Sequence, residues 1–216
     1  MPTDIHIATF IDGQFAENGF VVSVGETKLC WIIDPGFAPS PQRMIAHIAD
    51  KGLTPAALVL THGHLDHIKG VPEIREAYPE IPVYIAEAAR PALTDPTENG
   101  SAQYGFAIDV GEFDTLDLPH GSELKLGDTE WLLLDTSGHA PGSRSLYCEE
   151  AGIVFVGDAL FQQSIGRTDF ANSNHDELIR NIKEKLFTLP DETRVFSGHG
   201  PVTTIGDEKQ FNPFLQ

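Results

Sequence analysis

The sequence predicts an α/β fold, a four-layer α/β/β/α sandwich made of two similar β-rich halves with helices outside. Two observations predict it. Short apolar runs typical of strands fall into two groups, one before residue 61 and one after residue 122. Each group is accompanied by a segment with apolar residues at helical spacing. The length of 216 residues suits a single domain spanning residues 1–216.

Three strands are expected to open the first half, at residues 5–10, 19–24 and 28–33. Gly25 and Glu26 lie between the second and third strands and indicate a hairpin. The third strand runs into residues 34–36, whose Asp-Pro-Gly sequence is typical of a tight turn. These segments predict the strand layer of the first half.

Helices are expected to cover this layer. Ser40 and Pro41 indicate a helix start, with Ser40 as the N-cap, and Gly52 ends the helix. A strand at 57–60 then leads to a second helix around 71–78.

The second half follows a stretch without clear periodicity, residues 93–112, which predicts a long loop or flap. Hairpins are expected at 123–135 and at 143–158, the latter turning near Gly152. A helix over about 175–187 and a strand over 193–197 come last.

Composition narrows the function classes. The formal net charge of -18 repels phosphate backbones, so nucleic acid is not an expected partner. No apolar run is long enough to span a bilayer, and the N-terminus does not resemble a secretion signal, so we expect a cytoplasmic protein without a membrane partner. Cys30 and Cys148 lie in apolar runs and are expected to be buried. Nothing in the sequence sets the oligomeric state.

The most informative stretch is THGHLDH at residues 61–67, which holds three of the nine histidines. His62 and His64 are two residues apart at a strand end, so they face the same way. Asp66 and His67 lie beyond them and can form a second cluster nearby. Imidazole and carboxylate groups suit zinc, iron or manganese. The alternative is a polar loop with chance histidines.

Three further candidates share one setting, in which an apolar strand is followed by a glycine and then by the candidate itself. They are His139, Asp158 and His199. Glycine allows a tight turn at a strand end, and strand ends in α/β sheets collect catalytic groups. Each alone is a weak signal, but together with THGHLDH they predict one convergent site.

The segments THGHLDH, SGHAPGS, FVGDALF and SGHGP, in this order, resemble the metal-binding motifs of the metallo-β-lactamase superfamily. The resemblance spans residues 62–199 and implies the metallo-β-lactamase fold. SIGRTDF at 164–170 and the segment from Gly198 to Phe214 are similar to the short bacterial glyoxalase II-like hydrolases.

The resemblance implies two divalent metal ions per chain, with zinc first and iron or manganese as alternatives. The first ion would be bound by His62, His64 and His139, the second by Asp66, His67 and His199, and Asp158 would bridge both. Asp34 would support the site from outside; its alternative role is that of a plain turn residue. Arg167 is expected to pair with Asp169, and its alternative role is to meet an anionic substrate.

The implied activity is hydrolysis of a small-molecule thioester, such as an S-acylglutathione, by a metal-bridging hydroxide that Asp66 orients. The alternative is an oxidoreductase similar to persulfide dioxygenases, which use one iron held by two histidines and a carboxylate. The full second ligand set favours the hydrolase. A class B β-lactamase is less favoured, because several of those carry cysteine where Asp158 stands. A non-catalytic metal-binding module is not favoured, because no ligand is missing.

Overall fold

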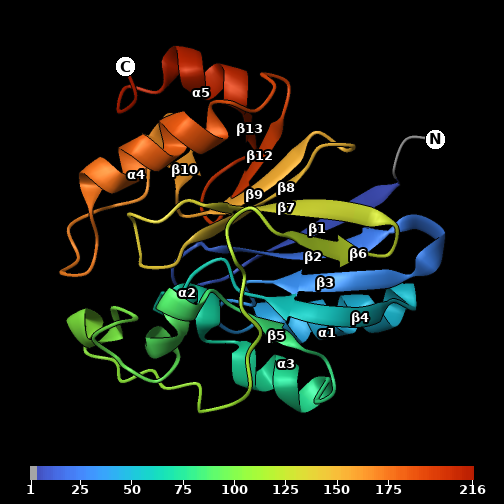
Figure 1. Ribbon diagram of the computed structural model, residues 1–216. Coiled ribbons are helices and arrows are strands. Elements are labelled where there is room, and N and C mark those ends of the chain that lie inside the picture. Colours follow the sequence, from blue (N-terminus) through green and yellow to red (C-terminus); the bar gives the residue numbers. More distant parts are fainter. Residues whose placement is uncertain (1–3) are drawn as a thin grey trace.

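The computed structural model describes residues 4–216 and arranges them in four layers (Figure 1). Two sheets lie face to face at the centre. Helices α1 (Ser40–Lys51) and α3 (Val71–Ala77) cover the outer face of one sheet. Helices α4 (His175–Asn181) and α5 (Ile205–Phe211) cover the outer face of the other. The predicted sandwich is therefore confirmed.

The first sheet has the strand order β1-β2-β3-β4-β5. Its strands are β1 (Ile5–Ile11), β2 (Asn18–Val24), β3 (Leu29–Ile33), β4 (Thr54–Val59) and β5 (Val83–Tyr84). The first three pair antiparallel, whereas β4 and β5 are added in parallel. The turn η1 (Gly25–Thr27) joins β2 to β3, as the sequence predicts. The short β5 was not predicted.

The second sheet has the order β13-β12-β9-β8-β7-β6. Its strands are β6 (Glu123–Leu126), β7 (Thr129–Asp135), β8 (Arg144–Cys148), β9 (Ile153–Gly157), β12 (Arg194–Ser197) and β13 (Thr203–Thr204). Strands β10 (Leu160–Phe161) and β11 (Ser164–Ile165) pair separately. Both predicted hairpins are present, and Gly152 turns the second with φ 59°.

The helices differ from prediction in detail. Helix α1 starts at Ser40, but the Ser40 hydroxyl is buried without a hydrogen bond and caps nothing, so the predicted N-cap is wrong. Gly52 ends α1 in the left-handed conformation, as predicted. The last predicted helix continues beyond α4 as a π-helical turn, η4 (Ile182–Leu186). A short helix, α2 (Leu65–Ile68), begins inside the 61–67 motif, and neither it nor α5 was predicted.

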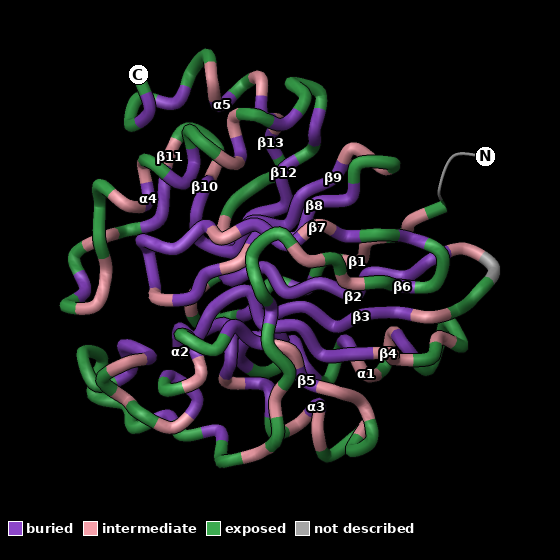
Figure 2. Tube along the Cα trace, in the orientation of Figure 1, coloured by how far each residue is buried: buried purple, intermediate pink, exposed green. Residues whose placement is uncertain are grey.

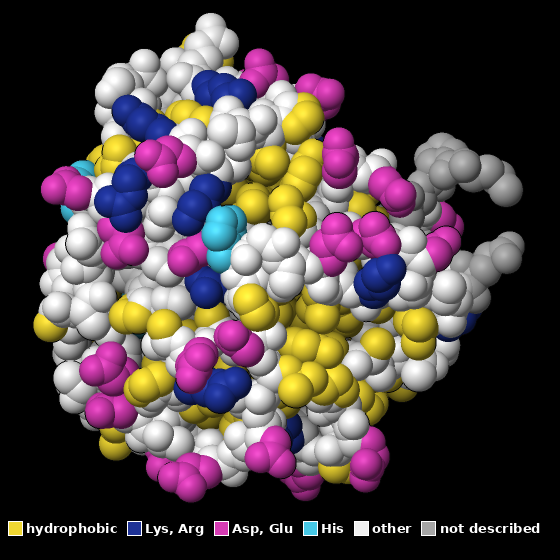
Figure 3. All heavy atoms as spheres, in the orientation of Figure 1, with side chains coloured by type: hydrophobic (Ala, Val, Ile, Leu, Met, Phe, Trp, Pro, Cys, Tyr) yellow, Lys and Arg dark blue, Asp and Glu magenta, His cyan; other side chains and the backbone are white. Residues whose placement is uncertain are grey.

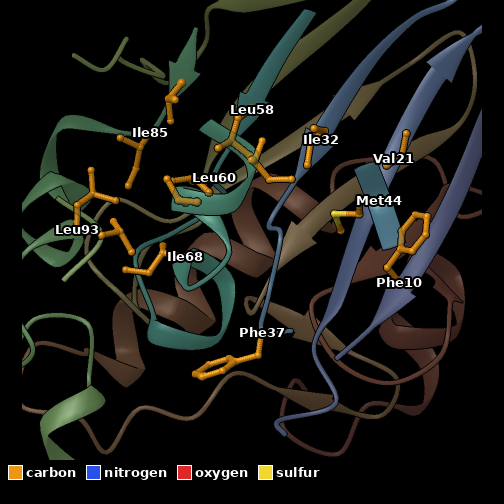
Figure 4. Packing of buried hydrophobic residues seen from close by; sticks show 14 of the residues in the cluster. Phe10, Val21, Ile32, Phe37, Met44, Leu58, Leu60, Ile68, Ile85 and Leu93 are labelled. Atoms are coloured by element: carbon orange, nitrogen blue, oxygen red, sulfur yellow. The ribbon is translucent and has the colours of Figure 1, made fainter. Parts of the chain in front are cut away.

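Three apolar clusters fill the spaces between the layers, and Figure 2 shows the strands as the buried centre of the molecule. Trp31 and Trp131 meet between the sheets, with ring centroids 5.6 Å apart. Met44 and Ile48 of α1 pack on the first sheet. Figure 4 shows Met44 among the neighbouring apolar side chains. Leu178 of α4 packs on the second sheet. Because strands β2 and β3 are covered on both faces, they read as nearly continuous apolar runs.

The 93–112 segment is irregular, as predicted, but it is anchored. It is preceded by the turn η2 (Glu87–Leu93) and contains η3 (Ser101–Tyr104). Buried Asn99 donates from Nδ2 to the carbonyl oxygens of Ala92 and Ile108, at 2.8 and 2.9 Å. Ile108 is itself part of the core under the first sheet. The tip is exposed, with Tyr104 43% and Phe106 45% exposed.

The surface agrees with the composition. Figure 3 shows acidic side chains scattered over the face in view rather than gathered in one patch. Among residues 4–216, no helix combines the length and apolar character needed to cross a membrane.

Candidate metal centre

Four strand ends carry the candidate ligands. Strands β7 and β9 are both antiparallel to β8, and β12 is parallel to β9, so β7, β9 and β12 run in one direction. Their carboxyl ends therefore meet at one edge of the second sheet, where each is followed by one candidate. The candidates of residues 62–67 follow β4 of the first sheet. The structure thus brings together residues from both halves.

The first cluster consists of His62, His64 and His139, all buried. Each offers a ring nitrogen, and these atoms lie within 4.8 Å of one another. The Nδ1 atom of His64 is 2.7 Å from Nε2 of His139. Three imidazoles converging in this way form a set that can hold one divalent ion and leave a position open.

The second cluster consists of Asp66, His67 and His199, whose ligand atoms also lie within 4.8 Å of one another. Asp66 and His67 come from the short helix α2, and His199 comes from the turn after β12. The Oδ2 atom of Asp66 is 3.2 Å from Nε2 of His199. The sequence analysis predicted these two groups.

Asp158 lies between the clusters. Its Oδ2 atom is 3.5 Å from Nε2 of His139 and 3.4 Å from Nε2 of His199. Its Oδ1 atom is 3.3 Å from Nε2 of His67. This carboxylate therefore reaches members of both clusters, as a bridging ligand must.

The donor set fits metal ions. The Nε2 atom of His62 is buried and has no hydrogen-bond partner among the described residues. The buried Nε2 atom of His67 and Oδ1 atom of Asp158, although 3.3 Å apart, lack the geometry of a hydrogen bond and have no other partner there. Buried polar atoms in proteins nearly always have a partner, so lone pairs converging without one indicate a bound cation. Nitrogen and carboxylate oxygen ligands without a thiolate suit zinc, iron or manganese.

Charge distribution in the two clusters agrees with this fit. Burial lowers the pKa of His62, and lowers that of His64 to about 3, so both rings are neutral and their lone pairs are available. Burial opposes charge on His199 as well, but Asp158 and Asp66 outweigh it and raise the pKa of His199 to about 10. The carboxylates of the second cluster therefore favour a positive charge beside them, which a cation supplies.

Asp34 orients the histidines. Its Oδ1 atom accepts from the backbone N–H of Thr61 at 2.8 Å, and its Oδ2 atom accepts from the Thr61 hydroxyl at 2.6 Å. The same Oδ2 lies 2.9 Å from Nδ1 of His67, and the Thr61 hydroxyl lies 3.1 Å from Nδ1 of His62. Bonds to Nδ1 turn Nε2 of each ring toward the site. Asp34 is thus more than a turn residue.

Sequence reasoning missed Thr61 and Glu17. The Glu17 carboxyl is fully buried, and its Oε1 atom is 3.8 Å from Nδ1 of His67. Burial raises the pKa of Glu17. For Glu17, the sequence signal was an acidic residue just before an apolar strand, as in AENGFVV at residues 16–22.

A pocket of about 310 Å³ opens onto both clusters. Four aromatic side chains line it, Phe15, Tyr104, Phe161 and Phe170, together with Leu65, Ser164, Ile165 and Arg167. A cavity of about 380 Å³ lies over β1 and α1 and contains no candidate ligand, so we assign the chemistry to the smaller pocket.

Arg167 forms the ion pair with Asp169 that the sequence analysis favoured, and it also lines the pocket. Its guanidinium donates to both carboxylate oxygens of Asp169, at 2.6 and 2.7 Å, and to the Tyr104 hydroxyl at 3.0 Å. It also lies 4.5 Å from the centre of the Phe170 ring. These contacts join the 164–170 segment to the tip of the 93–112 segment at the rim of the pocket.

Comparison with known proteins agrees with the fold. The sequence profile of the metallo-beta-lactamase superfamily matches residues 13–199. The chain belongs to the metallo-β-lactamase superfamily.

Relatives within this superfamily include metal-dependent hydrolases. The chain is 43% identical over 187 residues to the probable metallo-hydrolase YqgX of Bacillus subtilis, covering 86% of this chain and 87% of that protein. It is 35% identical over 191 residues to the hydroxyacylglutathione hydrolase GloC of Haemophilus influenzae, covering 88% and 89%.

Solved structures of the superfamily resemble the whole chain. The B3 metallo-beta-lactamase BLEG-1 matches with TM-score 0.91 and 38% identity, covering 98% of this chain and 100% of that one. TTHA1623 in a di-iron-bound form matches with TM-score 0.83 and 36% identity, covering 96% and 100%. ETHE1 from Myxococcus xanthus matches with TM-score 0.79 and 28% identity, covering 96% and 83%.

Proposed function

We propose that this superfamily member hydrolyses a small-molecule thioester, such as an S-acylglutathione, with two divalent metal ions. The observation that carries the proposal is the complete second cluster beside the first, with Asp158 within reach of both. A one-iron oxidoreductase has no use for that second set. The relationship to GloC supports a thioester as the substrate class.

The candidate ligands form two metal sites that share one carboxylate. His62, His64 and His139 would hold the first ion, Asp66, His67 and His199 the second, and Asp158 would contact both. Ions bound in such a pair supply a nucleophilic water at neutral pH and a Lewis acid for the substrate carbonyl. No serine or cysteine nucleophile is then needed, and both cysteines are buried in strands, away from the pocket.

Asp66 lines the pocket, and we assign it a catalytic role. Its carboxylate can accept a hydrogen bond from the attacking water and so direct a lone pair of that water toward the carbonyl carbon. The aromatic wall of Phe15, Tyr104, Phe161 and Phe170 packs against the substrate and displaces bulk water from it. Arg167 also lines the pocket, with its charge paired to Asp169.

The alternative is a mononuclear iron oxidoreductase of the persulfide dioxygenase type. The likeness to ETHE1 fits it, and the di-iron-bound form of TTHA1623 supports iron as a possible metal. The two functions differ in the source of oxygen, which is water for the hydrolase and O₂ for the oxidoreductase.

The test is an assay of zinc-reconstituted and of iron-reconstituted protein on S-D-lactoylglutathione, under air and under nitrogen, beside oxygen uptake by both samples with glutathione persulfide. We expect equal thioester cleavage in both atmospheres and no oxygen uptake. The variant His199→Ala is expected to lose on the order of 100-fold in turnover or more, because the second ion loses a ligand. Iron-dependent oxygen uptake without thioester cleavage would establish the alternative. A β-lactam serves as a third substrate, because of the likeness to BLEG-1.

A further inference from the structure

We propose that Asn18 is a positioning residue for the second metal ion, because its side-chain amide holds the turn that carries His199. The inference rests on the proposed function in one respect, the assignment of His199 as a ligand of that ion. Asn18 itself contacts neither cluster, and it is the first residue of β2 in the other half of the molecule.

His199 needs such support more than the other candidate ligands do. Its side chain is 27% exposed, whereas the other candidates are buried. Its ring meets Phe161 edge-on at a centroid distance of 5.8 Å. Part of the ring therefore stays exposed to solvent, so the backbone of the turn contributes to the position of the ring.

Asn18 holds that backbone by three hydrogen bonds. Its main-chain N–H donates to the carbonyl oxygen of Gly198 at 2.6 Å. Its Nδ2 donates to the carbonyl oxygens of Ser197, at 3.0 Å, and of Gly200, at 2.8 Å. The acceptors lie on both sides of His199, so the amide spans the turn. An isolated bridge between Glu17 and His199 continues the pairing.

The other bonds of the turn come from its own half. The Gly198 N–H donates to Gly157 of β9 at 2.8 Å, and the Ser197 hydroxyl donates to the His199 carbonyl at 2.9 Å. Asp66 and His67, the partners of His199 in the second cluster, belong to the first half. Asn18 ties the turn to that half, and therefore governs the distance of His199 from Asp66 and His67.

The chemistry of this position requires two donors. A primary amide presents two N–H groups, and the described contacts use Nδ2 for two carbonyl oxygens. A carboxylate of the same shape presents only acceptors, so Asn18→Asp would face both carbonyls with a repelling charge. Asn18→Ala removes both side-chain bonds but keeps the bond from the main chain.

The experiment is calorimetric titration of metal-free protein with zinc alone, which counts the bound ions and gives their affinities without an activity assay. For Asn18→Ala we expect the first zinc to bind as in the wild type and the second to bind about 10- to 100-fold more weakly. Asn18→Asp should weaken the second zinc further. Asn212→Ala is the control, because Asn212 is also a buried amide whose Nδ2 donates to two oxygens, the Ser164 carbonyl and a Glu208 carboxylate oxygen, and neither partner is a candidate ligand. It should keep both affinities.

His199→Ala separates this inference from the proposed function. If that variant still binds two zinc ions with wild-type affinity, the ligand assignment fails. If it loses the second ion while Asn18→Ala keeps it at full affinity, the positioning role alone is overturned. An equal loss of affinity for both zinc ions in Asn18→Ala also overturns the positioning role. Should Asn18→Ala not fold, Asn18→Ser retains one donor and undergoes the same titration, with unchanged second-ion affinity as the contradicting result.

Discussion

At the scale of single residues, the site depends on glycines that leave room for its ligands. A Cβ atom on Gly198 would collide with Oδ1 of Asp158 and with the ring of His67. The neighbouring carboxylate would have to move from its place between the clusters. Glycine before His199 is thus required by the close approach of the backbone to two candidate ligands, and not only by the turn.

We expect Gly198→Ala to bind fewer metal ions and to lose at least about 10-fold in turnover, with about 1–3 kcal/mol less stability because of overpacking. Metal analysis and denaturant unfolding measure these effects. Gly13→Ala is the control, because no atom lies within 4 Å of a Cβ built there. Equal behaviour of the two variants would contradict the packing argument.

The bridging role of Asp158 gives a second prediction at this scale. Asp158→Ala should lower the occupancy of both ions, because this carboxylate reaches both clusters. Elemental analysis after dialysis should approach two ions per chain in the wild type and fall clearly below that in the variant. Two tightly held ions in Asp158→Ala would contradict bridging.

At the scale of elements, the turn after β7 illustrates how the sheet edge presents a ligand. Asp135 ends β7, and its Oδ1 accepts from the backbone N–H of Ser137 at 3.0 Å and from the Ser137 hydroxyl at 2.6 Å. Arg144 of β8 lies 3.2 Å from the same oxygen. The turn to His139 is thereby fixed by a polar group outside the metal centre.

This turn predicts part of the response to acid. Partial burial of Asp135 opposes its charge, but the bonds from Ser137 and the charge of Arg144 outweigh burial and lower the pKa of the carboxyl. A depressed pKa in the folded state stabilises the protein above the unfolded pKa of about 3.9, and this contribution is lost as the pH falls further. Asp135→Asn should therefore reduce stability by about 1 kcal/mol at neutral pH and flatten the decline of unfolding free energy between about pH 5 and 3. Urea unfolding between these pH values measures the free energy of unfolding of both proteins. The same dependence on pH in Asp135→Asn and the wild type would contradict this prediction.

The helices and strands differ in how well the sequence predicts them. Long apolar runs and helical spacing identified β1 to β4, both hairpins, α1 and α4, because burial imposes a period on the residues. The two-residue strands β5, β10, β11 and β13 are too short to carry a period. The candidate ligands were recognisable because each follows a strand, and the structure brings them together. Asn18, Glu17 and Thr61 were missed, because their contacts join segments far apart in sequence.

At the scale of the whole molecule, the three apolar clusters lie between the layers, and the candidate ligands lie at one edge. We therefore expect the chain to stay folded when chelator removes the ions, unlike a zinc finger. Its stability should still fall, by about 2.7 kcal/mol for each ion present at 100 times its dissociation constant.

Thermal unfolding with and without chelator measures this loss, and the expected shift is on the order of 5–10 °C for each ion. Adding zinc back should restore the midpoint. Complete loss of helical signal at room temperature after chelation would contradict the view that the layers hold themselves together.

The order of the ligands along the chain has a consequence for biosynthesis. The first candidate is residue 62 and the last is residue 199, and β12, which leads to His199, pairs with β9 and β13. When only the first half of the chain has emerged from the ribosome, His62, His64, Asp66 and His67 are present without the ligands of the second half. Both ions can therefore be captured fully only when β12 has emerged and inserted beside β9, so we expect complete metal loading to follow the synthesis of β12.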